Sequence, residues 1–160
     1  MSELTRVVVL ALGIGLATGL RSMTPIAVTT WFAHLAWIAL RHTPLAFLAS
    51  LPAVAIFTLA AVGELVVDKL PKTPARTAAS GLAARFVMGG LCGAAIALAS
   101  AQVGWVVGAL LGAAGGIIGA FAGYQARARL VQALGVPDLV VAFAEDAVAI
   151  GASIIILRFA

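Results

Sequence analysis

The sequence predicts an all-α membrane protein, a polytopic transmembrane helical bundle of five to six segments. Apolar residues make up 63% of its 160 residues and charged residues 10%, and the mean hydropathy is +1.15. An average soluble domain is about 45–50% apolar and about 25% charged. The apolar residues also form long continuous runs, without the period-two alternation of a β-barrel. These observations exclude a soluble domain, a disordered chain and a disulfide scaffold.

Six apolar runs supply the predicted helices: 7–20, 22–40, 45–67, 81–100, 104–124 and 138–157. A straight membrane span needs about 20 residues, and run 7–20 is short by that measure. Arg21 alone separates it from run 22–40, so five or six segments are expected. We expect one transmembrane domain over 1–160, with halves of about 1–68 and 81–160 joined by a loop at 69–80. Run 7–20 is read as a retained span because no signal-peptide cleavage site follows it.

Basic residues in the loops predict the orientation of the bundle. With six segments, one side carries Arg21, Lys69, Lys72, Arg76, Arg127 and Arg129, and the other carries Arg6, Arg41 and Arg158. The positive-inside rule places the larger set in the cytoplasm and both termini outside; a five-segment count would move the N-terminus. The net charge of +4 comes from scattered residues, so no nucleic-acid partner is predicted.

Glycines in run 104–124 predict close helix packing. They recur every four residues in two adjacent stripes: Gly108, Gly112 and Gly116, and Gly115, Gly119 and Gly123. Small residues on one face let another backbone approach closely within a membrane. We expect this helix to pack on two neighbours within the chain. The alternative is a seam between two copies, and a homo-oligomer, preferably a dimer, is the expected assembly.

Ionisable residues within or beside the apolar runs are the candidate binding residues, because a charge at the bilayer centre costs at least ~2.5–3.5 kcal/mol. They are Arg21, Glu64, Asp68, Arg85, Glu145 and Asp146. Tracking the six runs places all of them in the cytoplasmic half of the membrane. This predicts one inward-facing polar pocket, with Arg21–Glu64 and Arg85–Glu145 as candidate ion pairs. Carboxylates this close together can also relay protons.

The segment around Arg21 predicts an interrupted helix. Gly15 and Gly19 precede the arginine, Ser22 follows it, and Pro25 lacks a backbone N–H. Such breaks persist in a membrane where they line protein or water, and helix ends beside an arginine suit an anion. The alternative is a tight loop with Arg21 extending to the membrane surface.

Glu145 and Asp146 are adjacent on one predicted helix, so their side chains point about 100° apart and cannot both face one partner. A weak internal repeat accompanies these charges. Gly19-Leu20-Arg21 leads through two apolar runs to Glu64, and a similar segment ending at Arg85 leads through two runs to Glu145. Duplicated halves with a site at their junction are common in small transporters.

Three features together resemble an uncharacterised bacterial membrane family, catalogued as a domain of unknown function. They are Gly19-Leu20-Arg21, the spacing of Glu64, Asp68, Lys69 and Pro71, and the glycine-rich C-terminal half. The resemblance implies a small multi-pass protein of the inner membrane. It implies no activity, substrate or catalytic residue.

Buried charge and the broken segment favour a small transporter or channel for a small anion or ion, coupled to a proton or cation. The alternative is a structural or partner-binding membrane module, in which the charges hold the bundle together. An intramembrane enzyme is a third possibility, because Glu64, Asp68, Glu145 and Asp146 could hold Mg²⁺. No hydrolase or zinc motif is present, and no catalytic residue or cofactor is predicted.

Overall fold

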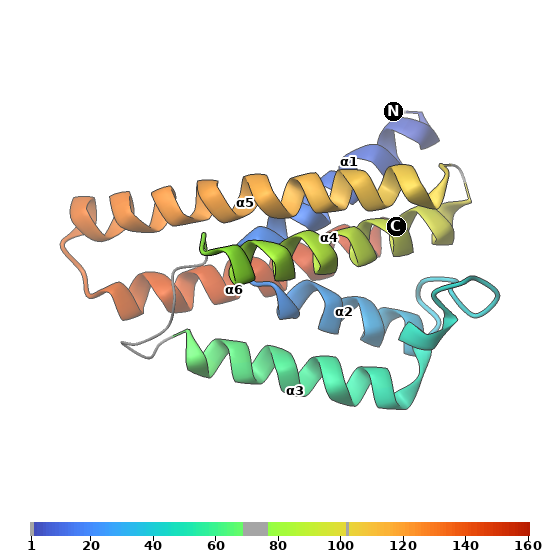
Figure 1. The fold of residues 1–160 in the computed structure, drawn as a ribbon, viewed down its shortest axis with the longest axis horizontal. Coiled ribbons are helices and arrows are strands. Elements are labelled where there is room, and N and C mark those ends of the chain that lie inside the picture. The colour runs from blue at the N-terminus through green and yellow to red at the C-terminus, as the bar shows by residue number, and fades with distance from the viewer. Residues whose placement is uncertain (1, 69–76, 102) are drawn as a thin grey trace.

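A computed structural model describes residues 2–68, 77–101 and 103–160 of the chain (Figure 1). In these ranges the protein is helical and contains no strand. The elements are α1 (Glu3–Leu20), α2 (Met23–His34), the 3-10 helix η1 (Ala46–Ala49), α3 (Leu51–Val67), α4 (Ala79–Ser100), α5 (Trp105–Leu134) and α6 (Asp138–Arg158). This confirms the all-α bundle and the higher of the two expected helix counts.

Four helices are long and apolar enough to cross a membrane: α1, α4, α5 and α6. Helix α3 is apolar but has 17 residues. The predicted run 7–20 was short because α1 begins four residues earlier, at Glu3, after Ser2 caps the helix by accepting from the backbone N–H of Thr5. A side-chain cap of this kind satisfies one of the backbone N–H groups that have no partner in the first turn of a helix.

Run 22–40 does not form the full span that the sequence predicted. Helix α2 has 12 residues, about 18 Å of helix against a hydrocarbon core of about 30 Å. It ends because Ala36 adopts a left-handed conformation with φ 59°. The amides of Ala36 and Trp37 then donate to the carbonyls of Ala33 and Phe32 at 3.2 and 2.8 Å. This pair of hydrogen bonds forms a Schellman motif.

Helix α5 continues beyond the break that the sequence predicted at 127–137. It extends to Leu134 and has 30 residues, about 45 Å of helix. Its end is set by Gly135, which has φ 62°, followed by Pro137. The predicted loop 69–80 lies mostly outside the described residues, and α4 begins at Ala79.

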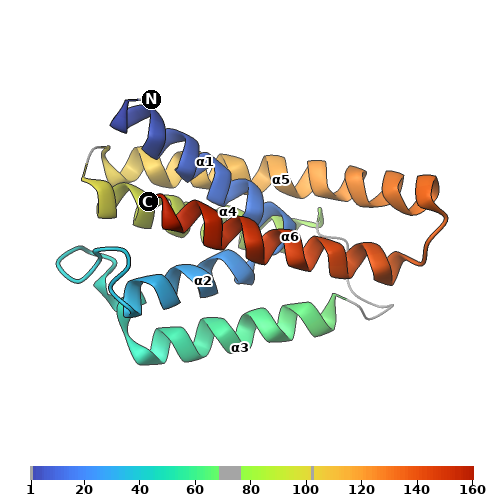
Figure 2. The same ribbon diagram turned by 180° about the vertical axis from the view of Figure 1, so that it is seen from behind.

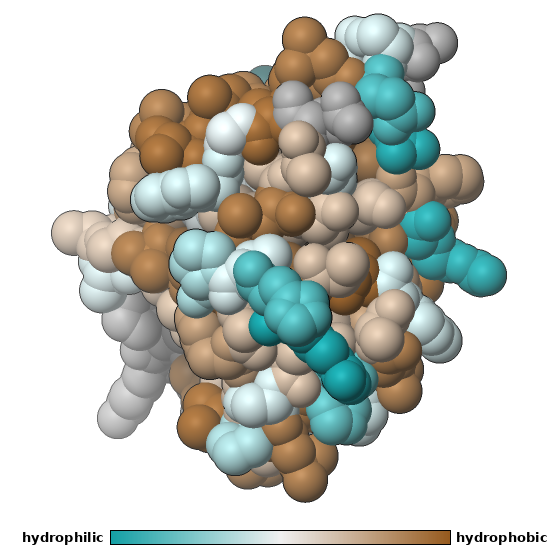
Figure 3. All heavy atoms as spheres, turned by 90° about the vertical axis from the view of Figure 1, so that its right-hand side faces the viewer, coloured by the Kyte–Doolittle hydropathy of each residue, from teal (hydrophilic) through white to brown (hydrophobic). Residues whose placement is uncertain are grey.

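Successive helices run in opposite directions through the bundle, as both ribbon views show (Figures 1 and 2). The C-terminal ends of α1, α3 and α5 therefore lie at the same end as the N-terminal ends of α2, α4 and α6. Both chain termini lie at the other end, which Figure 3 views directly: hydrophilic atoms there are scattered among apolar ones. Helix α2 contacts α3, α4 and α6, whereas α3 lies at the side of the bundle against α2.

Both glycine stripes of α5 face neighbouring helices of the same chain. Gly108, Gly112 and Gly116 meet backbone atoms of α4, and Gly115 and Gly119 meet α1; Gly123 is buried on the same helix. A Cβ atom at Gly112 would lie 2.1 Å from the carbonyl oxygen of Gly89. The backbones of α4 and α5 are thus in direct contact, and these stripes are covered within one copy of the chain.

Candidate functional site

The break between α1 and α2 is the centre of the candidate site. Helix α1 ends at Leu20, Arg21 has an extended backbone (φ −137°, ψ 117°), and α2 begins at Met23. Pro25 is the third residue of α2, where the missing N–H has no helical partner to lose. Helices α1 and α2 run in opposite directions on either side of Arg21 (Figure 1), so this segment is a tight connection between two helices, the alternative to the interrupted helix that the sequence predicted. Arg21 is fully buried, with 0% of its surface exposed, so it does not extend to the membrane surface.

Two carboxylates from different helices hold the guanidinium of Arg21. Its Nε donates to Oδ1 of Asp146 on α6 at 2.6 Å, and its Nη1 donates to Oδ2 of Asp68 at the end of α3. Its Nη2 is buried and has no hydrogen-bond partner among the described residues. A buried donor without a partner costs about 1–3 kcal/mol. The arginine therefore joins three parts of the chain, and its Nη2 group is left without a partner among the described residues.

Glu64 does not pair with Arg21 as predicted. Its carboxylate caps the start of α2: Oε1 accepts from the backbone N–H and hydroxyl of Ser22 at 2.8 and 2.5 Å, and Oε2 accepts from the backbone N–H of Met23 at 2.8 Å. A carboxylate at a helix N-terminus satisfies open donors and complements the positive end of the helix dipole. Ser22 stands directly before an apolar run, which is a usual position for a residue at the start of a helix. This position was the available signal for its contact with Glu64.

Arg85 caps the end of α1 in a similar way. Its Nε donates to the carbonyl of Gly19 at 3.0 Å, and its Nη1 donates to the carbonyl of Gly81 at 3.0 Å. The side chain is 4% exposed. A cation at a helix C-terminus satisfies carbonyls that lack helical partners. Arg21 thus contacts carboxylates, whereas these two contacts of Arg85 are to carbonyl groups.

Glu145 belongs to a second cluster of charges, beside the α5–α6 turn. Nη1 of Arg127 lies 3.5 Å from its Oε2, and the same guanidinium binds both oxygens of Asp138 at 2.7 and 2.5 Å. This differs from the predicted pair with Arg85. Adjacent Glu145 and Asp146 therefore face different partners, as their helical spacing predicted. The sequence predicted Arg127 in a loop and Asp138 at the start of the last apolar run; their opposite charges on either side of the turn at Gly135 and Pro137 were the available signal.

All six predicted site residues lie in or beside the helix halves that meet at the end of the bundle where α1, α3 and α5 end and α2, α4 and α6 begin. Arg21, Glu64, Asp68 and Asp146 meet at the α1–α2 break, and Arg85 contacts the same break through Gly19. Among the described residues that meet at this break, the three carboxylates of Glu64, Asp68 and Asp146 outnumber the two guanidinium groups of Arg21 and Arg85. Among the described residues, no three His, Cys, Asp or Glu side chains are placed to hold a metal ion.

Comparison with known proteins identifies a family for the chain but gives no activity. No curated protein and no solved structure matches the chain. A family model described as "Domain of unknown function (DUF4126)" matches residues 8–160, a range that includes every residue of the charged site. The membrane-span-like helices, the broken segment at Arg21 and this match agree with the resemblance found in the sequence, and the chain belongs to the DUF4126 family.

Proposed function

We propose that this protein is a small membrane transporter or channel in which Arg21, Asp68 and Asp146 form the site for a small ion. The observation that supports the proposal best is a fully buried arginine at a helix break, with one donor open. Charged groups inside membrane proteins are costly and commonly mark ion pathways.

The charge balance of the cluster supports a coupled mechanism. One guanidinium faces two carboxylates, so the three groups carry a net charge of −1 when all are ionised. The open Nη2 donor of Arg21 suits an anionic oxygen, but an added anion would raise the excess negative charge in a low-dielectric site. Protonation of Asp68 or Asp146, or entry of a cation, offsets that charge. Anion binding is therefore expected to require an accompanying proton or cation.

Buried polar side chains continue from the cluster into the bundle. The hydroxyl of Thr24, one turn after Arg21, is buried without a hydrogen-bond partner among the described residues. Further along α2, the hydroxyl of Thr29 lies 3.6 Å from the thiol of Cys92 on α4. The hydroxyl of Thr29 also donates to the carbonyl of Pro25 at 2.8 Å, as other buried hydroxyls here donate to carbonyls of their own helices. These groups give an entering ion or water molecule polar contacts beyond Arg21.

The test is flux through the purified protein in liposomes. Proton movement is followed with a pH-sensitive dye under gradients of chloride, phosphate or acetate, at pH 5 and pH 8. Wild-type protein should move protons with one of these anions, and Asp146→Asn and Arg21→Gln should reduce the rate at least about tenfold. Arg129→Gln, at an exposed arginine of α5, is the matched control and should retain the wild-type rate. Equal rates for all four proteins would refute the proposal.

A structural or partner-binding module is the second candidate, favoured by the caps that Glu64 and Arg85 provide. In that case the charges stabilise a break that the bundle requires. Removing one partner of a buried ion pair costs about 3–5 kcal/mol. Arg21→Gln should then melt far below the wild type and bind nothing. A folded Arg21→Gln protein that has lost flux would instead support transport.

A further inference from the structure

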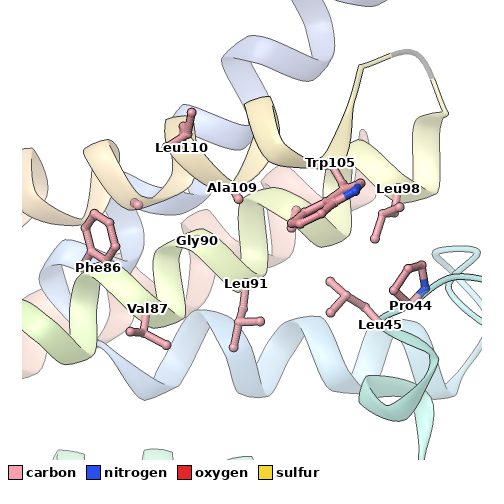
Figure 4. A pocket seen from close by; sticks show the side chains of 12 residues that line it. Pro44, Leu45, Phe86, Val87, Gly90, Leu91, Leu98, Trp105, Ala109 and Leu110 are labelled. Carbon is pink, nitrogen blue, oxygen red and sulfur yellow. The ribbon is translucent and has the colours of Figure 1, made fainter.

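A long apolar groove on the surface of α4 and α5 lies apart from the charged site. Its volume is about 450 Å³ and its lining is apolar. Gly90 and Ala94 of α4 and Ala109 and Ala113 of α5 form the floor, between the larger side chains of Phe86 and Trp105 (Figure 4). The groove exists because small residues on both helices leave space that bulky residues at its two ends do not fill.

The dimensions of the groove favour a single hydrocarbon chain. Its lining extends along α4 from Phe86 to Leu98, about 18 Å at 1.5 Å per residue. The small residues between α4 and α5 leave a narrow apolar floor along this length, which suits an extended chain. Both walls belong to candidate membrane spans. The surroundings of such a groove in a membrane are lipid acyl chains.

One end of the groove carries features of a membrane interface. Trp105 begins α5 and is 54% exposed, and tryptophan favours the headgroup level of a bilayer. Pro44 and Leu45 close the same end (Figure 4). They follow Arg41 and His42, which are both exposed and belong to the same short turn, where the amide of Thr43 donates to the carbonyl of Leu40 at 3.1 Å. A cationic side chain beside an apolar groove complements an anionic headgroup.

We propose that this groove is a binding site for one acyl chain of an anionic phospholipid, whose phosphate lies at the Arg41–His42 turn. The site is independent of the Arg21 cluster and of any transport activity. The acyl chain packs against the apolar walls of the groove, and these contacts replace those that it would make with other lipid chains. The basic turn selects the headgroup, because a basic residue close to the membrane surface attracts anionic lipid.

The chain offers a matched pair of glycines for the test. A Cβ atom at Gly90 would make ordinary contacts, 3.5 Å from the carbonyl of Ala109 and 3.7 Å from the Cβ of Ala113. The first side-chain atom of Gly90→Leu therefore fits between the helices, and we expect the rest of the side chain to occupy the groove that Gly90 lines. Gly63 on α3 has nothing within 4 Å of such an atom, so Gly63→Leu is the control. Ala109→Leu narrows the same groove from α5 and provides a second, independent obstruction.

The experiment titrates delipidated protein in detergent with dioleoyl phosphatidylglycerol or dioleoyl phosphatidylcholine and counts bound lipids by native mass spectrometry. Wild type and Gly63→Leu should bind one phosphatidylglycerol, preferred about fivefold over phosphatidylcholine. Gly90→Leu and Ala109→Leu should bind it about tenfold more weakly. A double substitution, Arg41→Gln with His42→Gln, should lose the preference and keep the phosphatidylcholine affinity.

Three results would overturn the proposal. The first is a Gly90→Leu or Ala109→Leu protein that melts at the wild-type temperature and binds phosphatidylglycerol with the wild-type affinity. The second is that the wild type binds phosphatidylglycerol and phosphatidylcholine equally, as does the Arg41 and His42 double variant. The bound molecules would then be ordinary lipid that surrounds the protein without a specific site. The third is a dimer in the wild type that disappears in Gly90→Leu without any bound lipid, which would make the groove a contact between two copies.

Discussion

Substituting Gly112 by alanine tests the closest helix contact in the bundle. The added Cβ atom would lie 2.1 Å from the carbonyl oxygen of Gly89, with the Cα of Gly93 at 3.0 Å. An unstrained carbon–oxygen contact needs about 3.3 Å, so α4 and α5 would have to separate by about 1.2 Å at this point. Both colliding groups are backbone atoms, which cannot rotate away as a side chain would.

The expected cost lies at the upper end of the range for overpacking, about 3 kcal/mol of unfolding free energy. Gly90→Ala is the control on the same helix pair, because its Cβ contacts are at 3.5 Å or more. It should be neutral or stabilising by up to about 1 kcal/mol, since alanine favours helix more than glycine does. The assay is an SDS titration in mild detergent, followed by circular dichroism. Equal unfolding midpoints for the two variants would refute the packing reasoning.

Three further predictions concern the charged site and the topology. Asp146→Asn should lower stability by about 3 kcal/mol because it leaves Arg21 with a weakened partner in a fully buried site, whereas Glu145→Gln should cost about 1 kcal/mol because its contact with Arg127 is long, 3.5 Å, and Asp138 still binds that guanidinium; similar midpoints in the same titration would contradict the assigned partners. Glu64→Gln should cost about 1 kcal/mol by weakening the cap of α2, and an unchanged melting temperature would show that this cap contributes nothing. A cysteine at Arg129 should react with impermeant thiol reagents from the side opposite both termini, and labelling from the terminal side would contradict the six-helix path.

Helix boundaries were predictable where a local signal exists. The apolar runs gave the bounds of α4 and α6 to within two residues, and Pro25 with its neighbouring glycines indicated the break at Arg21. The end of α2 was not predictable, because Ala36 adopts a left-handed conformation that usually selects glycine or asparagine. The length of α5 was also missed, because Arg127 and Asp138 become partners only once α5 and α6 are placed side by side.

The sequence by itself determined the environment, the helical class, the glycine faces of α5 and the end of the bundle at which the charges gather. Each of these follows from composition or from spacing along a single helix. Tertiary structure decided which charges meet. Glu64 and Asp68 share one face of α3, yet the helix packing places Glu64 at the start of α2 and Asp68 at Arg21. Their partners depend on how α3 is rotated and shifted against α2 and α6, and side-chain packing between helices sets that arrangement.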